Sequence, residues 1–272
     1  MIDNENIFTH YPIKGEIIES KPFGEGHINS TYLVTFKNNE KETSYILQLI
    51  NDAIFHPVEM LMKNFLLVTK HCQNKIKEQG GDSHRETINV ILTNEDKPFV
   101  VIENKYYRVL EYIDNTIALQ IIKNPIDFFY SAVAFANFYK MLEDFDASQL
   151  YEIIPNFHNT EKRYKDFLTA VKLDKMKRAK TCKQEIKFIM NRKHYYPLIV
   201  NMLKEKKIPT RVTHNDTKLN NILFDIKTKR PVAVIDLDTI MPGTICYDFG
   251  DAIRFGCNSA NEDEKDLDIM PK

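Results

Sequence analysis

Tryptophan is absent from this sequence of 272 residues, glycine occurs only eight times, and neither sign of charge is in excess. The 37 Lys and Arg residues nearly balance the 38 Asp and Glu residues, which gives a net charge of −1. This balance gives no electrostatic reason to expect nucleic acid or an anionic membrane as a partner. No apolar run reaches the ~20 residues of a membrane-spanning helix, and the N-terminus lacks the pattern of a signal peptide. We therefore expect a cytoplasmic protein.

Cysteine is also scarce, and no C-x-x-C motif is present. The four cysteines are interpreted as reduced, mostly structural thiols: Cys72, Cys182, Cys246 and Cys257. The hydrophobic share of 43% is ordinary for a globular protein. The length allows a substantial core, either in one two-lobed domain or in two small domains.

Strand patterns dominate residues 1–112. One helix is expected over 57–78, because Pro57 suits a first helical position and Gly80 and Gly81 would end the helix. The apolar and β-branched runs, with turn residues between them, predict strands over 15–23, 28–36, 43–50, 86–92, 99–102 and 106–112.

Helical patterns follow residue 112. Asn124 and Pro125 fit an N-cap followed by proline at the first helical position. Apolar residues then recur at steps of four and three, as on one helix face: Phe128, Ala132, Phe135, Tyr139 and Leu142. Further helices with mixed, solvated charges are expected over 160–171 and 183–204. The chain is therefore predicted to be α+β, with an N-terminal antiparallel-sheet lobe (1–112) and a mainly helical C-terminal lobe (113–272).

The most informative residues are 212–221 (VTHNDTKLNN) and 234–238 (VIDLD). Phosphoryl transfer needs a group that takes the proton of the acceptor hydroxyl and cations that neutralise the donor phosphate. Asp216 is the candidate base. Asn221 and Asp236 are candidate Mg²⁺ ligands, because magnesium binds oxygen ligands and keeps several waters. Each residue alone also fits a turn or the end of a strand, but their joint pattern favours the chemical interpretation.

This pattern, H-x-D-x-x-x-x-N followed by I-D-x-D, resembles the aminoglycoside phosphotransferase and choline kinase-like family. Three longer strings are similar to the bacterial N-acetylhexosamine 1-kinases: T-H-N-D-T-K-L-N-N-I-L-F-D, V-I-D-L-D-T-I-M-P-G and Y-D-F-G-D-A-I-R-F-G. The resemblance implies a two-lobed, protein-kinase-like fold that uses ATP and Mg²⁺. It also implies a small-molecule acceptor, an amino sugar phosphorylated at its anomeric hydroxyl.

Two residues beside the candidate base have open roles. Lys218 is a candidate catalytic residue that would stabilise charge in the transition state, and an exposed loop lysine explains it equally well. Asp238 would either assist the metal or fix its loop. His214 is interpreted as a structural hydrogen-bond partner.

Candidate nucleotide-binding residues lie in the N-terminal lobe. Gly24 and Gly26 would let backbone N–H groups approach the ATP phosphates, although an ordinary hairpin turn also explains them. On the third strand, Gln48 stands where related kinases carry a lysine, and Leu49 replaces the arginine of the L-Q-R string in the resembled sugar kinases. Arg108 is the other charged residue of note. The adenine edge is expected to meet the backbone of Leu110, Glu111 and Tyr112.

Candidate acceptor-binding residues are implied by the resemblance. They are His27, in the string G-H-I-N-x-T-Y, and Asp251 and Arg254. The sequence Asp248-Phe249-Gly250 spells the metal-binding tripeptide of protein kinases, but it follows Asp216 too far along the chain, and Asp236 is better placed. For Asp248 and Asp251 a structural role, holding backbone amides, is favoured over direct substrate contact.

Two alternatives remain open at this point. The first is a kinase of another small acceptor, such as choline, homoserine or an aminoglycoside. The second is a catalytically weak nucleotide-binding module, which Gln48 and Leu49 favour and the intact Asp216, Asn221 and Asp236 oppose. Members of the resembled family usually continue with further C-terminal helices, so the C-terminal lobe is expected to be truncated.

Overall fold

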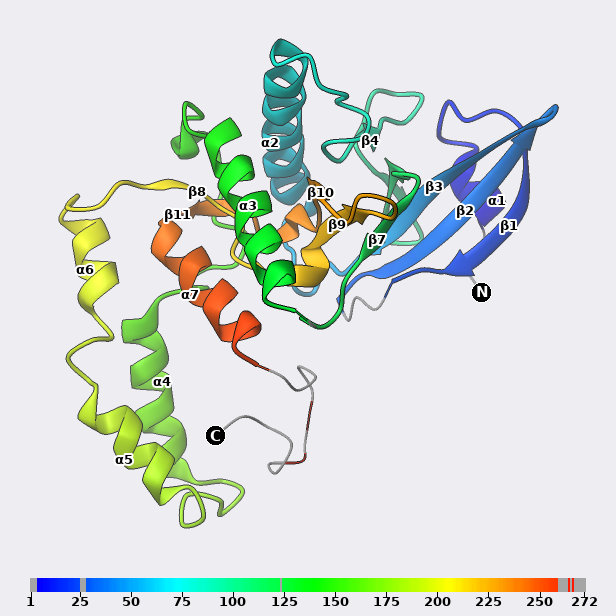
Figure 1. Ribbon diagram of the computed structural model, residues 1–272. Helices are drawn as coiled ribbons and strands as arrows, with labels where there is room; N and C mark the ends of the chain where they lie inside the picture. The colour runs from blue at the N-terminus through cyan, green and yellow to red at the C-terminus, as the bar shows by residue number, and fades with distance from the viewer. Residues whose placement is uncertain (1–3, 25–27, 123, 259–263, 265, 267–272) are drawn as a thin grey trace.

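The computed structural model describes residues 4–24, 28–122, 124–258, 264 and 266. An antiparallel sheet forms the N-terminal part, and helices dominate the C-terminal part (Figure 1). This is the α+β arrangement that the sequence predicts. Among the described residues, no helix is both long enough and apolar enough to span a membrane.

The N-terminal sheet has the strand order β1-β2-β3-β6-β4, and β5 pairs with β6. All of these pairings are antiparallel. Two-residue turns join β2 to β3 and β5 to β6, and Glu103 and Asn104 between β5 and β6 both have positive φ, as a two-residue hairpin loop requires. The strands are β1 (Glu16–Pro22), β2 (Ser30–Asn38), β3 (Lys41–Ile50), β4 (Val90–Ile91), β5 (Val100–Ile102) and β6 (Lys105–Glu111).

Two helices cover opposite faces of this sheet. The short helix α1 (Asn4–Phe8) packs against one face, where Phe8 meets Phe36 at a ring-centroid distance of 4.8 Å. The long helix α2 (Val58–Glu78) packs against the other face and joins a core that continues into the C-terminal part. Since successive residues of a strand point to opposite faces, β3 supplies both cores.

The chain enters the C-terminal part after β6. It first forms β7 (Thr116–Ala118), which pairs with β9 in the small sheet β10-β9-β7. A second pair, β11-β8, lies beside it. The predicted lobe boundary after Tyr112 falls in the connection between β6 and β7 and stays a prediction. The remaining strands are β8 (Arg211–Thr213), β9 (Ile222–Asp225), β10 (Pro231–Val234) and β11 (Met241–Gly243).

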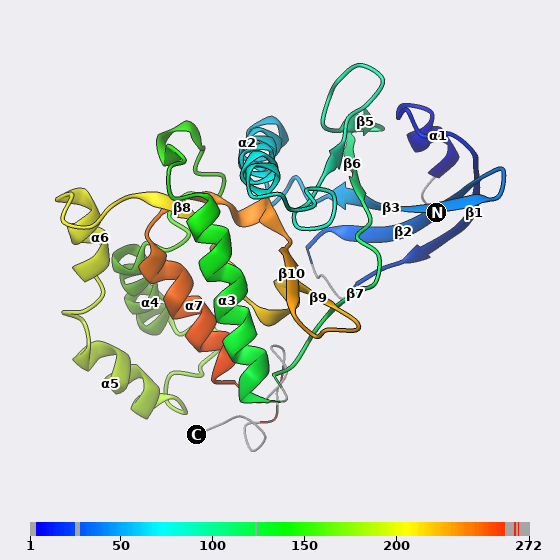
Figure 2. The ribbon, with the colours of Figure 1, turned by 45° about the horizontal axis from the view of Figure 1, so that its top comes forward.

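Helices α3 (Pro125–Met141) and α7 (Ile245–Gly256) run side by side next to these small sheets, as both views show (Figures 1 and 2). The α3 helix begins at the predicted cap, where the Asp127 carboxylate accepts the backbone N–H of Asn124 at 3.0 Å. Three helices lie farther from the N-terminal sheet: α4 (Thr160–Leu173), α5 (Lys183–Asn191) and α6 (Leu198–Lys204).

Two expectations about individual elements are wrong. The strand expected over 86–92 is only the two-residue β4. The single helix expected over 183–204 is divided into α5 and α6, because Pro197 has no N–H to continue the helical hydrogen bonds and serves as the N-cap of α6. The face predicted for α3 is largely the buried one, since Phe135 and Leu142 are buried, Phe128 and Tyr139 are half-buried, and only Ala132 of the five is exposed.

Candidate active site

A cleft of about 1100 Å³ is lined by residues of both parts of the chain. Ten of the predicted site residues line it: Gly24, Gln48, Leu110, Glu111, Tyr112, Asp216, Lys218, Asn221, Asp236 and Arg254. Of the other three, Asp251 is not among the lining residues, and Gly26 and His27 lie outside the described residues. The cleft therefore brings together predicted residues that are up to 230 positions apart in the sequence, from Gly24 to Arg254.

The loop that follows β8 holds the candidate base. Asn215 adopts a positive φ of 67°, which turns the chain before Asp216. The side-chain amide of Asn221, in the 3-10 helix Leu219–Asn221, donates to the Asp216 carbonyl at 2.8 Å and to its Oδ2 at 2.9 Å. The Lys218 ammonium lies 3.1 Å from Asp216 Oδ1. Asp216, Lys218 and Asn221 therefore form one contacting group in the cleft.

Asp236 is brought next to this group through the backbone. The N–H of Ile235 donates to the carbonyl of Asn221 at 2.9 Å, and a ring nitrogen of His214 lies 2.9 Å from the Ile235 carbonyl. Asp236 then leaves β10 with a positive φ of 58°. This bond pattern gives His214 the structural role that the sequence predicts and holds Asn221 and Asp236 side by side.

The electrostatic surroundings of Asp236 fit a cation. Its carboxylate is open to the cleft but enclosed by protein on its other sides, and this loss of water raises its pKa to about 6 from an ordinary 3.8. The negative charges of Asp238 and Asp216 add to the rise in pKa. Among the described residues, no cluster of three or more His, Cys, Asp or Glu side chains has metal-site geometry. A cation here would thus rely on Asp236, the amide oxygen of Asn221 and ligands that the substrate brings.

Two carboxylates of α7 accept hydrogen bonds from the backbone of the loop that carries Asp216. Asp248 accepts the backbone N–H groups of His214 at 2.9 Å and Asn215 at 2.6 Å, and the hydroxyl of Tyr139 at 2.7 Å. One turn later, Asp251 accepts the N–H of Thr217 at 2.8 Å. The Asp248-Phe249-Gly250 tripeptide is therefore part of the loop support, and burial raises the pKa of Asp248.

Replacing Asp248 by alanine should lower the free energy of unfolding by about 3–5 kcal/mol, because two backbone N–H groups and one hydroxyl lose their acceptor while buried. Urea unfolding followed by circular dichroism measures this change. Tyr139→Phe is the matched control, since it removes one of the three donors and should cost about 1 kcal/mol. A loss in Asp248→Ala no larger than in Tyr139→Phe would contradict the assigned role.

Asp251 also accepts a hydrogen bond from Arg254 Nε at 2.9 Å. The Asp251 carboxylate thus accepts hydrogen bonds from both Thr217 and Arg254. The Arg254 side chain itself reaches the cleft. Contact of either residue with an acceptor stays a prediction.

The N-terminal end of the cleft is mostly apolar. Leu110, Glu111 and Tyr112 line it, together with branched aliphatic side chains from several elements: Ile46, Ile88, Ile113, Leu223 and Ile235. Gly24 borders the cleft with a positive φ of 78°. A slot with apolar walls and one polar edge suits a flat heteroaromatic ring.

Gln48 and Leu49 point to opposite faces of the sheet. Gln48 lines the cleft, whereas Leu49 packs with the core that contains Phe36 on the other face. The missing arginine at position 49 therefore removes no charge from the cleft.

A buried ion pair beneath the cleft is the main feature that the sequence does not reveal. Both carboxylate oxygens of Asp238 accept from the Arg108 guanidinium, at 2.5 and 2.8 Å, and each side chain is 1% exposed. Arg108 Nε donates to Gln48 Oε1 at 2.9 Å. The open role of Asp238 is thus resolved by geometry, because its carboxylate fixes the loop to β6.

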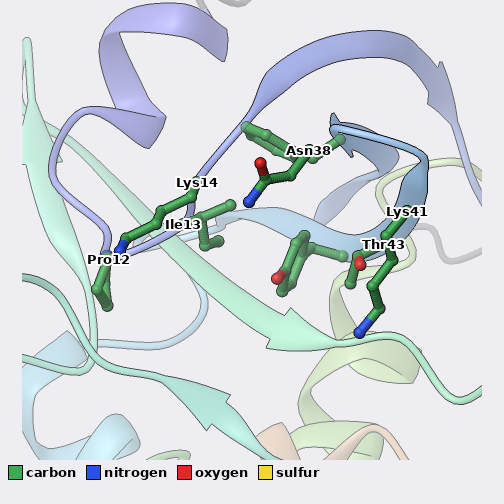
Figure 3. A pocket seen from close by; sticks show the side chains of 8 residues that line it. Pro12, Ile13, Lys14, Asn38, Lys41 and Thr43 are labelled. Carbon is green, nitrogen blue, oxygen red and sulfur yellow. The ribbon is translucent and has the colours of Figure 1, made fainter.

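A second, smaller hollow lies on the outer face of the N-terminal sheet (Figure 3). It measures about 230 Å³, and its lining residues include Lys14 and Lys41 but no Asp or Glu. It shares no lining residue with the large cleft. None of the described candidate site residues lines this hollow.

Residues 19–266 match the model of the phosphotransferase enzyme family, and the chain belongs to that family. Solved structures share its protein-kinase-like fold. An aminoglycoside phosphotransferase from Alicyclobacillus acidocaldarius is 14% identical, with a TM-score of 0.58 over 93% of this chain and 71% of the other. A choline kinase from Cryptosporidium parvum is 16% identical, with a TM-score of 0.52 over 97% and 72%. An ADP-bound aminoglycoside phosphotransferase is 18% identical, with a TM-score of 0.51 over 86% and 70%.

Proposed function

We propose that this protein is an ATP-dependent small-molecule kinase that transfers the γ-phosphate to the anomeric hydroxyl of an N-acetylhexosamine. The observation that carries the proposal is the contacting group of Asp216, Lys218 and Asn221 with Asp236 held beside it. Family membership supports the reaction class, and the strings shared with N-acetylhexosamine 1-kinases support the acceptor.

Asp216 would accept the proton of the acceptor hydroxyl. Its Oδ2 is oriented by the Asn221 amide and its Oδ1 by Lys218, so the carboxylate is held in one geometry before the acceptor binds. Such pre-orientation lowers the barrier because the reacting groups need not reorganise. Lys218, which contacts Asp216 in the cleft, would neutralise charge that develops on the transferred phosphoryl group. No covalent enzyme intermediate is required.

Magnesium would be held by Asp236 and the Asn221 amide oxygen, with the remaining ligands supplied by ATP phosphates and water. When bound, it would neutralise charge on the phosphates. The negative charges of Asp238 and Asp216, which add to the raised pKa of Asp236, support this assignment because a bound cation would offset them.

ATP would lie with its adenine against Leu110, Glu111 and Tyr112 and its phosphates toward Gln48 and Gly24. The apolar lining supports this orientation, and the ADP-bound relative supports nucleotide binding. Gly26 remains a proposed phosphate contact.

The charges lining the cleft favour a neutral acceptor. Among the described residues that line it, Glu111 at the adenine end is the one carboxylate besides Asp216 and Asp236. Near β7 and the end of α7, the lining side chains include Gln120, Asn220 and Arg254. A cationic acceptor needs carboxylates or an aromatic cage to offset its desolvation, whereas sugar hydroxyls pair well with amides and a guanidinium. His27, Asp251 and Arg254 remain proposed acceptor contacts.

Incubation with Mg-ATP and a panel of acceptors should release ADP with N-acetylglucosamine or N-acetylgalactosamine, and phosphorus NMR should show an anomeric phosphate. The panel also contains choline, homoserine and kanamycin. Turnover only with one of these three would keep the mechanism and replace the acceptor. Binding of Mg-ATP without turnover of any acceptor would favour a nucleotide-binding module and overturn the kinase proposal.

A further inference from the structure

We infer that Arg108 is a positioning residue that ties the nucleotide-facing side chain of Gln48 to the loop of Asp236. This inference rests on the proposed function, because it assigns Arg108 a task in Mg-nucleotide binding. It concerns a residue outside the reacting group, on β6, whose guanidinium reaches both parts of the chain.

The first contact of Arg108 orients Gln48. These two residues are paired across β6 and β3, and Arg108 Nε donates to Gln48 Oε1 at 2.9 Å. Because Oε1 is engaged, the amide nitrogen must point the other way, where it donates to Thr31 Oγ1 at 3.1 Å. An amide nitrogen carries two N–H groups, so one remains for a ligand in the cleft. Arg108 thus decides that Gln48 presents a donor, which suits phosphate, rather than an acceptor.

The second contact of Arg108 fixes the metal loop. Its terminal nitrogens hold both oxygens of Asp238, which lies in the 3-10 helix Leu237–Thr239 directly after Asp236. Asn29, just before β2, donates to the same carboxylate at 2.6 Å, and its own oxygen accepts the N–H of Asn51. Asp238 is therefore held by two segments of the N-terminal part, which restrains the position of Asp236.

The guanidinium is itself held in place. Its Cζ lies 4.7 Å from the ring centroid of Phe65 on α2, and the side chain is 1% exposed. A buried ion pair of this kind is weak evidence for stability, since apolar residues of similar size often replace such pairs without loss of stability. What apolar residues would not reproduce is the fixed direction of Gln48 and of the Asp236 loop.

The test compares Mg-ADP binding, by titration calorimetry, of the full chain and of the double variant Arg108→Met with Asp238→Leu. The double variant leaves no unpaired buried charge. We expect its Mg-ADP affinity to fall by about tenfold or more, the size of one lost hydrogen bond to a charged group. The midpoint of the Mg²⁺ dependence should rise, and KM for Mg-ATP should change more than kcat.

Arg108→Lys is the second variant, because it keeps the buried charge and tests the inference even if the double variant does not fold. A lysine lacks the planar guanidinium that donates to Gln48 and to both Asp238 oxygens. The Mg-ADP affinity of Arg108→Lys should therefore also fall. Gln48→Met should reproduce the loss of nucleotide affinity without the loss of folding stability expected from a broken ion pair.

Arg85→Met is the matched control. It removes another ion pair between the two parts of the chain, with Asp225 at 2.7 Å, that involves no residue of the metal loop. We expect unchanged Mg-ADP binding. Equal losses in Arg85→Met and the Arg108 variants, or wild-type binding in folded Arg108→Lys and in Gln48→Met, would overturn the inference. Absence of Mg-ADP binding in the unmodified chain would instead overturn the proposed function on which it rests.

Discussion

Asp216→Asn should lower kcat by about 10²–10⁴-fold, the contribution expected of a general base. The asparagine has the same shape and can still accept from the Asn221 amide, so the loop should keep its structure. It cannot take a proton from the acceptor. Binding of Mg-ATP should change little, because the phosphates are expected to lie toward Gln48 and Asp236.

The measurement is ADP release at saturating acceptor, with calorimetry of Mg-ATP binding alongside. Asp166→Asn on α4 serves as the control, since it changes an exposed carboxylate paired only with Lys162. Turnover of Asp216→Asn within a few-fold of the unmodified chain would show that the base lies elsewhere. Loss of Mg-ATP binding together with turnover would assign Asp216 to the metal.

Asp236→Asn should weaken Mg²⁺-dependent nucleotide binding by about 100-fold or more. Mutation of a residue that only supports a metal ligand typically lowers metal affinity 10–100-fold. Loss of a direct ligand should lower it at least as much. Turnover should fall with it and recover partly at high Mg²⁺. Asp225→Asn, at the end of neighbouring β9, is the control and should keep the Mg²⁺ dependence. Unchanged Mg²⁺ dependence in Asp236→Asn would remove it from the metal site.

The same substitution should stabilise the metal-free protein. The pKa of Asp236 is raised to about 6 in the folded state, so its ionised form opposes folding above that pH, and the penalty disappears below about pH 4. Because the carboxylate is open to the cleft, solvent screens much of this effect, and we expect about 1 kcal/mol, or a few degrees in Tm, at pH 7. Thermal melts of both proteins should converge as the pH is lowered from 7 to 4. A lower Tm for Asp236→Asn than for the unmodified protein at pH 7 would contradict the raised pKa of Asp236.

The residues of the reacting group could be predicted because their chemistry is local in the sequence. Asp216 and Asn221 are separated by one short turn, and β9 begins directly after Asn221. Asp236 lies two residues after the end of β10, the strand that pairs with β9. Arg108 and Asp238 are 130 positions apart, and no spacing rule links them. The pair forms because β3, β6 and the loop after β10 meet in the folded protein. The sequence could therefore show that Arg108 is a charged residue in an apolar strand, but not which residue it contacts.

The fold was predictable to a similar extent. Long strands with regular alternation, such as β2 and β3, lie near their expected ranges, because their pattern is strong over many residues. The three-residue β7 carries too little pattern to be recognised, and it forms because β9 offers an edge. The orientation of α3 depends on which neighbours it meets. Its own periodicity nevertheless located most of the buried face, and Ala132 is the one exposed position of the five predicted.

The attachment of the reacting loop to α7 has a mechanical consequence. Asp248 and Asp251 hold three successive parts of that loop, at His214, Asn215 and Thr217, and the helix is in turn fastened to α3 through Tyr139. The base and Asn221 are therefore expected to keep their positions relative to α3 and α7. Any movement of β2, β3 and β6 relative to these helices would have to break the buried pair of Arg108 and Asp238.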